Sequence, residues 1–189
     1  MSKKILKADF VFEYVIRDVN LLYWNKRIAA MKKGKKMERY KVILVDDEAE
    51  VIDMIEKKIH WNDLGFEVAG SATNGVKALE LVEKLQPDVV LTDIKMPYMD
   101  GLELARKLNQ DYPNIYIMLC TGFDEFEYAK EAVHLEIKEY MLKPISATEL
   151  SDSLVKLKNT LDKEREEKLN VKKLEDYFQE VLPKLQSNF

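Results

Sequence analysis

The sequence has one cysteine and two histidines, and this shortage excludes two kinds of stabilised protein. Cys120 has no partner for an internal disulfide, so the chain is not a disulfide-stapled secreted domain. His60 and His134 are far from Cys120 and from each other in the sequence, which is not the ligand spacing of a zinc site. The cysteine usage therefore favours a reducing compartment.

Long apolar runs are also absent, which argues against a membrane protein. The most apolar N-terminal segment is interrupted by Asp9, Glu13, Arg17 and Asp18, so it lacks the roughly 18 uninterrupted apolar residues of a membrane span. The same charges make it unsuitable as the core of a signal peptide. We expect a cytoplasmic protein with no membrane partner.

Glycine and proline are scarce, at 6 and 5 residues, whereas apolar residues make up 47% of the chain and charged residues 34%. This composition excludes collagen-like and disordered chains and suits a protein with a substantial core. The net charge of -4 conceals two different parts, because the residues through Lys41 carry +8 and the rest carry -12. An acidic main part is unsuited to binding DNA phosphates.

From Lys41 onward, short apolar runs alternate with stretches whose apolar residues recur at helical spacing, which indicates repeated βα units. The five expected strands are Lys41–Val45, Phe66–Ala72, Val89–Thr92, Ile115–Cys120 and Glu139–Leu142. Continuous apolar strands are typical of a parallel sheet that is covered by helices on both faces. We therefore predict an α/β fold with a doubly wound five-stranded parallel sheet, whose ligands bind at the carboxyl ends of the strands.

Polar side chains follow four of the expected strands at those carboxyl ends. They are Asp46, Asp47 and Glu48 after the first strand, Asp93 after the third, Thr121 after the fourth and Lys143 after the fifth. Crowded carboxylates repel one another unless a cation holds them, and hard oxygen ligands suit Mg²⁺. The sequence thus predicts a magnesium site at this edge. The alternative is that the three consecutive acids merely cap the following helix.

A carboxylate, a hydroxyl and an ammonium around Mg²⁺ would bind the oxygens of a phosphoryl group, which predicts phosphoryl transfer. Asp93 is the lone acid at the end of the expected central strand, so it is the candidate nucleophile that would form an acyl phosphate. Neither a P-loop nor a dinucleotide-binding fingerprint occurs in the chain, which argues against a nucleotide enzyme.

Several widely spaced motifs resemble the receiver domains of two-component response regulators. They are VDDE at Val45–Glu48, LTDIKMPYMDG at Leu91–Gly101, the pair Thr121-Gly122 and YMLKP at Tyr140–Pro144. The resemblance covers Glu38 to Leu161. Within it, the stretch HWNDLGFEVAGSATNGVKALE is similar to the sequences of receivers that precede AraC-type DNA-binding domains in Gram-positive bacteria. It implies a flavodoxin-like receiver fold and a signalling domain that is not a turnover enzyme.

The resemblance implies a role for each candidate site residue. Asp93 would accept the phosphoryl group, and Mg²⁺ would bind Asp47, Asp93 and the backbone carbonyl of Lys95. Asp46 would assist the metal through water. Haloacid dehalogenase phosphatases also form acyl phosphates, but they need an acid where this chain has Lys95, which argues against that enzyme class.

The resemblance also implies a switch and a set of partners. Thr121 and Tyr140 would be the switch pair, Lys143 would bind a phosphoryl oxygen, and the Lys143-Pro144 peptide bond would be cis. The implied partners are a sensor histidine kinase and a second copy of the chain in a homodimer, with transcription regulated through an output domain or partner. The open alternative is a receiver that is never phosphorylated and acts as a constitutive dimerisation module.

Two departures from the family pattern lie beside the site. Leu135 to Ile137 replace the usual glycine-containing turn, which predicts a longer or more helical turn there. Phe123 lies two residues after Thr121, and we hypothesise that its ring slows hydrolysis of the acyl phosphate, so that Phe123→Ala would shorten the lifetime of that phosphate.

The sequence after the receiver predicts a helix. We expect Leu150 to Leu161 to pack on the sheet and residues 161–189 to form a helical linker that promotes a dimer, with a coiled coil as one form of this linker. The step from Leu161 to Val171 breaks the heptad pattern, and Pro183 should stop or kink the helix. Too few residues follow Pro183 for an AraC-type output domain, so we expect no DNA binding by this chain alone.

Residues 1–37 form an extension of uncertain role that precedes the receiver, for which we assign residues 38–160. The extension is rich in apolar residues, and three explanations stay open: a docking segment, a cloning artefact or a misassigned start codon. The run from Lys32 to Lys36 is encoded by purine-rich codons, which supports the hypothesis that translation starts at Met37.

Overall fold

The computed structural model describes residues 39–122, 126–135 and 137–186. One compact unit spans Glu38–Leu161. Within the described residues, no helix combines the length and apolarity needed to cross a membrane.

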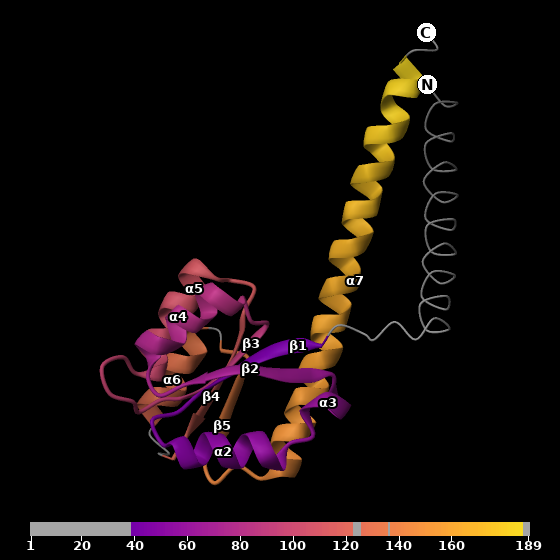
Figure 1. The fold of residues 1–189 in the computed structure, drawn as a ribbon. Helices are drawn as coiled ribbons and strands as arrows, with labels where there is room; N and C mark the ends of the chain where they lie inside the picture. Colours follow the sequence, from indigo (N-terminus) through magenta and orange to yellow (C-terminus); the bar gives the residue numbers. More distant parts are fainter. Residues whose placement is uncertain (1–38, 123–125, 136, 187–189) are drawn as a thin grey trace. The chain divides into compact units, whose positions relative to one another are not determined.

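The compact unit is built on a single parallel sheet, as the sequence predicts. Its strands are β1 (Tyr40–Val45), β2 (Phe66–Ala72), β3 (Val89–Asp93), β4 (Tyr116–Thr121) and β5 (Glu139–Leu142). Their order in space is β2-β1-β3-β4-β5, and every neighbouring pair is parallel (Figure 1). The order reverses direction between β1 and β3, which is where ligands bind in folds of this type.

Helices connect the strands and cover both faces of the sheet. They are α2 (Ala49–Lys58), α3 (Trp61–Leu64), α4 (Gly75–Leu85), α5 (Gly101–Asp111), α6 (Phe126–His134) and α7 (Ala147–Gln186). Two of them begin at side chains that accept a hydrogen bond from the first turn, Asn74 from the Lys77 amide and Asp100 from the Glu103 amide. Such caps satisfy backbone donors that the helix itself leaves unpaired.

The core consists of two apolar layers on opposite faces of the sheet, because successive side chains along a strand point to opposite faces. Along β1, Val42 and Leu44 pack in the layer that includes Ile52 of α2 and Leu154 of α7. Ile43 packs in the other layer, which includes residues of α4, α5 and α6. The expected arrangement, a doubly wound sheet between helices, is thus confirmed.

Helix α7 meets one expectation and differs from another. Leu150, Leu154 and Leu161 are buried in the core, as their spacing predicts. The helix does not stop at Pro183, however, but continues to Gln186. Proline removes one backbone donor and crowds the preceding turn, and the helix continues for only three residues beyond it.

The short helix α3 was not expected from the sequence. Four residues are too few to show a helical period, and Gly65 ends the helix in the left-handed conformation with φ of 84°.

Candidate functional site

The carboxyl edge of the sheet carries the polar residues that the sequence places there. Asp46 directly follows β1, Asp93 is the last residue of β3, Thr121 is the last residue of β4, and Lys143 directly follows β5. Asp46, Asp93 and Thr121 are all buried, with 4%, 8% and 1% of their surface exposed. Buried polar groups in a protein need partners, and at this edge the partner of both carboxylates is a single lysine.

The ammonium of Lys143 joins the two buried carboxylates. Its Nζ lies 2.6 Å from Oδ2 of Asp46 and 2.9 Å from Oδ1 of Asp93. Both distances are typical of charge-assisted hydrogen bonds. The first, third and fifth strands of the chain are therefore connected by one cation that bridges two acids.

Burial and the ion pairs together set the charge state of this trio. Burial raises the pKa of Asp93, and this effect outweighs the hydrogen bond and positive charge of Lys143, which lower it. Burial, the largest single effect, lowers the pKa of Lys143, but the hydrogen bonds to Asp46 and Asp93 together with the negative charges of these acids outweigh burial and raise the pKa. Lys143 therefore stays cationic, whereas Asp93 is an acid that burial makes costly to ionise.

The structure changes the expectation that three crowded carboxylates need Mg²⁺ to hold them together. Only Asp46 and Asp93 are buried, Asp47 is exposed, and the cation between the two buried acids belongs to the protein itself. Among the described residues, no three His, Cys, Asp or Glu side chains converge enough to hold a metal ion. Mg²⁺ often takes only one or two carboxylates and keeps several waters, so the oxygen donors at this edge fit its chemistry without a three-acid cluster.

Asp46 also stabilises the turn that follows β1. Its Oδ1 accepts a hydrogen bond from the amide of Glu48 at 3.0 Å, while its Oδ2 accepts from Lys143. Glu48 is the N-cap residue of α2, and its side chain makes no capping hydrogen bond. The three consecutive acids are therefore not a simple helix cap, because Asp46 has a long-range partner 97 residues away.

The proposed switch residues lie on the two strands beyond β3. Thr121 is paired in register with Leu142, and its carbonyl accepts a hydrogen bond from the Lys143 amide at 2.7 Å. Tyr140 is half-buried against the layer on the α4–α6 side of the sheet. The peptide bond between Lys143 and Pro144 is cis, as expected.

Of the remaining candidates, Lys95 is among the described residues, whereas Phe123 and Glu136 are not. Lys95 is exposed, and its Nζ lies 5.6 Å from the centre of the Tyr128 ring, a cation–π contact between the β3–α5 loop and α6. Phe123 lies outside the described residues, as does Glu136 within the turn after α6.

Gly101, which lies against the backbone of Asp93, was not among the predicted site residues. A Cβ on Gly101 would lie 2.0 Å from the backbone oxygen of Asp93, and the Gly101 amide donates to the carbonyl of Ile94 at 2.8 Å. The hydroxyl of Thr92 also donates to the Asp93 carbonyl at 2.9 Å. The glycine at the end of the MDG motif was the available signal, because close backbone approach is a common reason for glycine.

Comparisons with known proteins agree with this geometry. Residues 42–155 match the model of the response regulator receiver domain. The chain is 44% identical over 115 residues to YesN of Bacillus subtilis, an uncharacterised transcriptional regulatory protein, and 34% identical over 122 residues to the transcriptional regulatory protein HptR of Staphylococcus aureus. These matches cover 61% and 65% of the chain, but the chain spans only 31% and 48% of the two relatives.

Solved structures show the same fold. The receiver domain of the response regulator AraT from Geobacillus stearothermophilus matches with a TM-score of 0.64 at 39% identity, over 67% of this chain and 98% of that one. A two-component AraC transcriptional regulator from Clostridium phytofermentans matches with a TM-score of 0.62 at 32% identity, over 67% and 98% of the two chains. Because the family model matches more than half of its residues, this chain belongs to the response regulator receiver domain family of two-component signalling.

Proposed function

We propose that this receiver accepts a phosphoryl group on Asp93. The observation that carries the proposal is the bridge made by Lys143, whose ammonium contacts both Asp46 and Asp93 at the carboxyl edge of the sheet. A buried acid beside a fixed cation is suited to nucleophilic catalysis, because the cation can neutralise the oxygens of the incoming group. The function is assigned to residues 38–160.

The chemistry begins with an ionised Asp93. One carboxylate oxygen attacks the phosphorus atom of the donor, the bond from phosphorus to the donor breaks, and the donor leaves with that electron pair. The product is an acyl phosphate on Asp93. Lys143 then has a third anionic partner, so its contacts to Asp46 and Asp93 must be redistributed toward a phosphoryl oxygen.

Receiver domains generally bind Mg²⁺ at the phosphorylation site. In this chain Asp47, Asp93 and the backbone carbonyl of Lys95 would hold the ion, and Asp46 would assist through water. When bound, Mg²⁺ would neutralise charge that develops on the transferred group. Asp46 and Lys143 supply the fixed charges around it from the protein side.

The response to phosphorylation would involve Thr121 and Tyr140. Thr121 ends β4, the strand next to Asp93, and its carbonyl is bonded to the Lys143 amide. A new phosphoryl oxygen would draw the Thr121 hydroxyl toward Asp93, and the half-buried Tyr140 ring would turn into the space that is vacated. The affected surface is α6, β5 and the start of α7.

Receivers of response regulators generally interact with histidine kinases, and we propose a sensor histidine kinase as the phosphoryl donor. We further propose that the chain forms a homodimer, helped by residues 161–189, and regulates transcription through an output domain or partner. The matched relatives carry transcriptional regulatory names and are longer than this chain. The acidic charge of the chain after Lys41 does not favour DNA binding by this chain alone.

The test is phosphorylation with a small donor such as acetyl phosphate, followed by intact-mass measurement. With Mg²⁺ present, we expect the mass to rise by one phosphoryl group, and the added group to be removed by hydroxylamine, which cleaves acyl phosphates and leaves phosphoesters intact. Asp93→Asn and a chelator should each abolish the addition. Asp152→Asn, an exposed acid on α7, is the matched control and should be labelled normally.

A chain that folds normally and binds its partners but is not labelled would contradict the proposal. Size measurement of the same sample would then show whether the chain is the constitutive dimerisation module that the sequence leaves open as the alternative function. A dimer that forms equally with and without the phosphodonor would support that alternative.

A further inference from the structure

The last part of α7 has an apolar stripe that no described residue of the receiver covers. Val171 and Phe178 are 57% and 45% exposed, and Leu174 lies between them and is half-buried. Their spacing of three and four residues places all three on one face of the helix. Exposed apolar side chains at this spacing are typical of a helix that packs against another helix.

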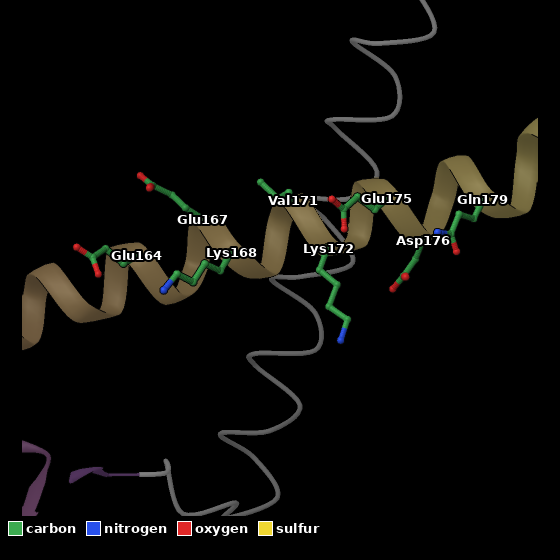
Figure 2. Close-up of a pocket in the computed structure, with 8 residues that line it drawn as sticks. All are labelled: Glu164, Glu167, Lys168, Val171, Lys172, Glu175, Asp176 and Gln179. Carbon is green, nitrogen blue, oxygen red and sulfur yellow. The ribbon is translucent and has the colours of Figure 1, made fainter. Parts of the chain in front are cut away.

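A groove adjoins this stripe at Val171, although Leu174 and Phe178 do not line it, and its described lining residues carry a net negative charge. Figure 2 shows its lining residues along α7, with Val171 among them. The charged lining residues are Glu164, Glu167, Glu175, Asp176, Lys168 and Lys172. Four acids against two bases favour a partner that is apolar and basic.

The N-terminal segment of the same chain combines an apolar stretch with flanking positive charge. Residues 1–37 contain ten basic and three acidic residues, but the apolar stretch 10–24 itself has one base and two acids, so nine of the bases lie on either side of it. Within them, Phe12, Val15, Val19 and Leu22 recur at steps of three, four and three, the pattern that Val171, Leu174 and Phe178 also follow. Two matching patterns of this kind allow side chains of one helix to pack between those of another.

The described fold shows where this segment is attached. The amide of Tyr40 at the start of β1 donates to the carbonyl of Gly65 at 3.0 Å. Gly65 in turn lies against the side chain of Lys158 of α7. The approach is so close that a Cβ on Gly65 would lie 2.5 Å from the Lys158 Cε. The N-terminal segment therefore joins the receiver beside the turn of α7 that precedes Leu161.

The connecting residues are long enough to reach the stripe. Val171 follows Leu161 by ten residues, a distance of about 15 Å along a helix. Residues 25–38 can span about 45 Å when extended. A tethered segment has a high effective concentration at a site within its reach, which favours the segment of the same chain over a separate molecule.

We propose that residues 10–24 dock on the apolar stripe of α7 formed by Val171, Leu174 and Phe178. The segment covers the face that would otherwise be available to a second copy of the helix. It therefore acts as an intramolecular competitor of dimerisation through α7, and its release would expose the stripe. This contact does not depend on phosphorylation of Asp93.

The test is hydrogen exchange of the full chain, measured by mass spectrometry at a concentration where light scattering shows a monomer. We expect amides in residues 10–24 and 168–179 to exchange at least tenfold more slowly than in the double variant Val171→Asp, Phe178→Asp. Leu169→Asp is the matched control, because Leu169 is also exposed on α7 but lies on the other side of the helix. It should keep the protection.

A second variant separates docking from damage to α7 itself. Val15→Asp with Val19→Asp leaves the sequence of α7 unchanged, yet it should abolish the protection of residues 168–179 and increase self-association. Equal exchange in this variant and in the parent chain would overturn the proposal. So would protection that appears only when the chain becomes a dimer, which would identify a second copy as the occupant of the stripe.

Discussion

Gly101 lies directly against the backbone of Asp93, so closely that a Cβ on Gly101 would lie 2.0 Å from the Asp93 carbonyl oxygen and 3.0 Å from its carbonyl carbon. Gly101 is the first residue of α5, and Asp93 is the last residue of β3. The helix after the β3–α5 loop therefore supports the end of the central strand. Any side chain at position 101 would push the proposed phosphoacceptor out of place.

Gly101→Ala should lower the free energy of unfolding by about 3 kcal/mol, because the atoms that the new Cβ would meet belong to the backbone and cannot rotate away. Gly122→Ala is the matched control, since a Cβ there meets no atom within 4 Å. It should change stability by less than about 1 kcal/mol. Urea unfolding of both variants gives the comparison, and equal stability of the two would contradict the packing argument.

Lys143→Ala should lower the free energy of unfolding by about 3 kcal/mol, because two buried carboxylates lose the cation that they share. The loss should be smaller in the presence of Mg²⁺, which can replace part of the missing charge. Lys57→Ala removes the exposed ion pair with Asp53 on α2 and should cost less than about 0.5 kcal/mol. A Lys143 variant as stable as the Lys57 variant would show that the bridge contributes nothing to folding.

Asp93→Asn should stabilise the chain at neutral pH by about 1 kcal/mol in the presence of a chelator. Burial raises the pKa of Asp93, so the folded state binds its proton more tightly than the unfolded state does. The stabilising contribution of protonated Asp93 is present below the pKa that Asp93 has in the unfolded state. It is lost as the pH rises through the higher pKa that Asp93 has in the folded state. The stability gap between variant and parent should therefore widen from acidic to neutral pH, as measured by urea unfolding at several pH values.

In the opposite result, the free energy of unfolding of the parent chain would rise relative to that of Asp93→Asn as the pH rises. That result would mean that Lys143 lowers the pKa of Asp93 more than burial raises it. Asp152→Asn provides the control for the loss of one exposed negative charge. We expect its stability to stay within about 0.5 kcal/mol of the parent chain throughout this pH range.

Cys120 should not react with thiol reagents in the folded chain. It is buried in β4, and burial raises the pKa of its thiol to about 12. Since the thiolate is the reactive form, iodoacetamide should add to the chain only after unfolding. Intact-mass measurement over time with and without urea provides the check, and rapid labelling of the native chain would show that β4 opens.

The sheet was predictable because its five strands are continuous apolar runs, and the boundaries differ from the predicted ones by one residue at most at each end. Thr121 and Asp93 prove to be the last residues of their strands rather than the first residues after them. The order of the strands in the sheet could not be predicted in the same way, because apolar spacing shows that strands exist but does not show which strands are neighbours. The order was available only through the family resemblance.

The site was predictable as a set of residues but not as a set of contacts. Position in the sequence shows that Asp46, Asp93 and Lys143 reach one edge of the sheet, but the length and direction of the Lys143 side chain decide that it contacts both acids. Asp46 and Asp47 are neighbours in the sequence, yet Asp46 is buried in contact with Lys143 whereas Asp47 is exposed. Charge alone could not distinguish these neighbours.

The two ends of the Asp46–Lys143 contact are 97 residues apart in the chain. During synthesis, Asp46 and Asp93 therefore leave the ribosome well before the lysine that completes their pocket. A nascent or truncated chain that lacks β5 has the proposed acceptor acid but no bridging ammonium, so it lacks the intact site. The proposed phosphoryl transfer would therefore be restricted to chains whose first and last strands have already joined the same sheet.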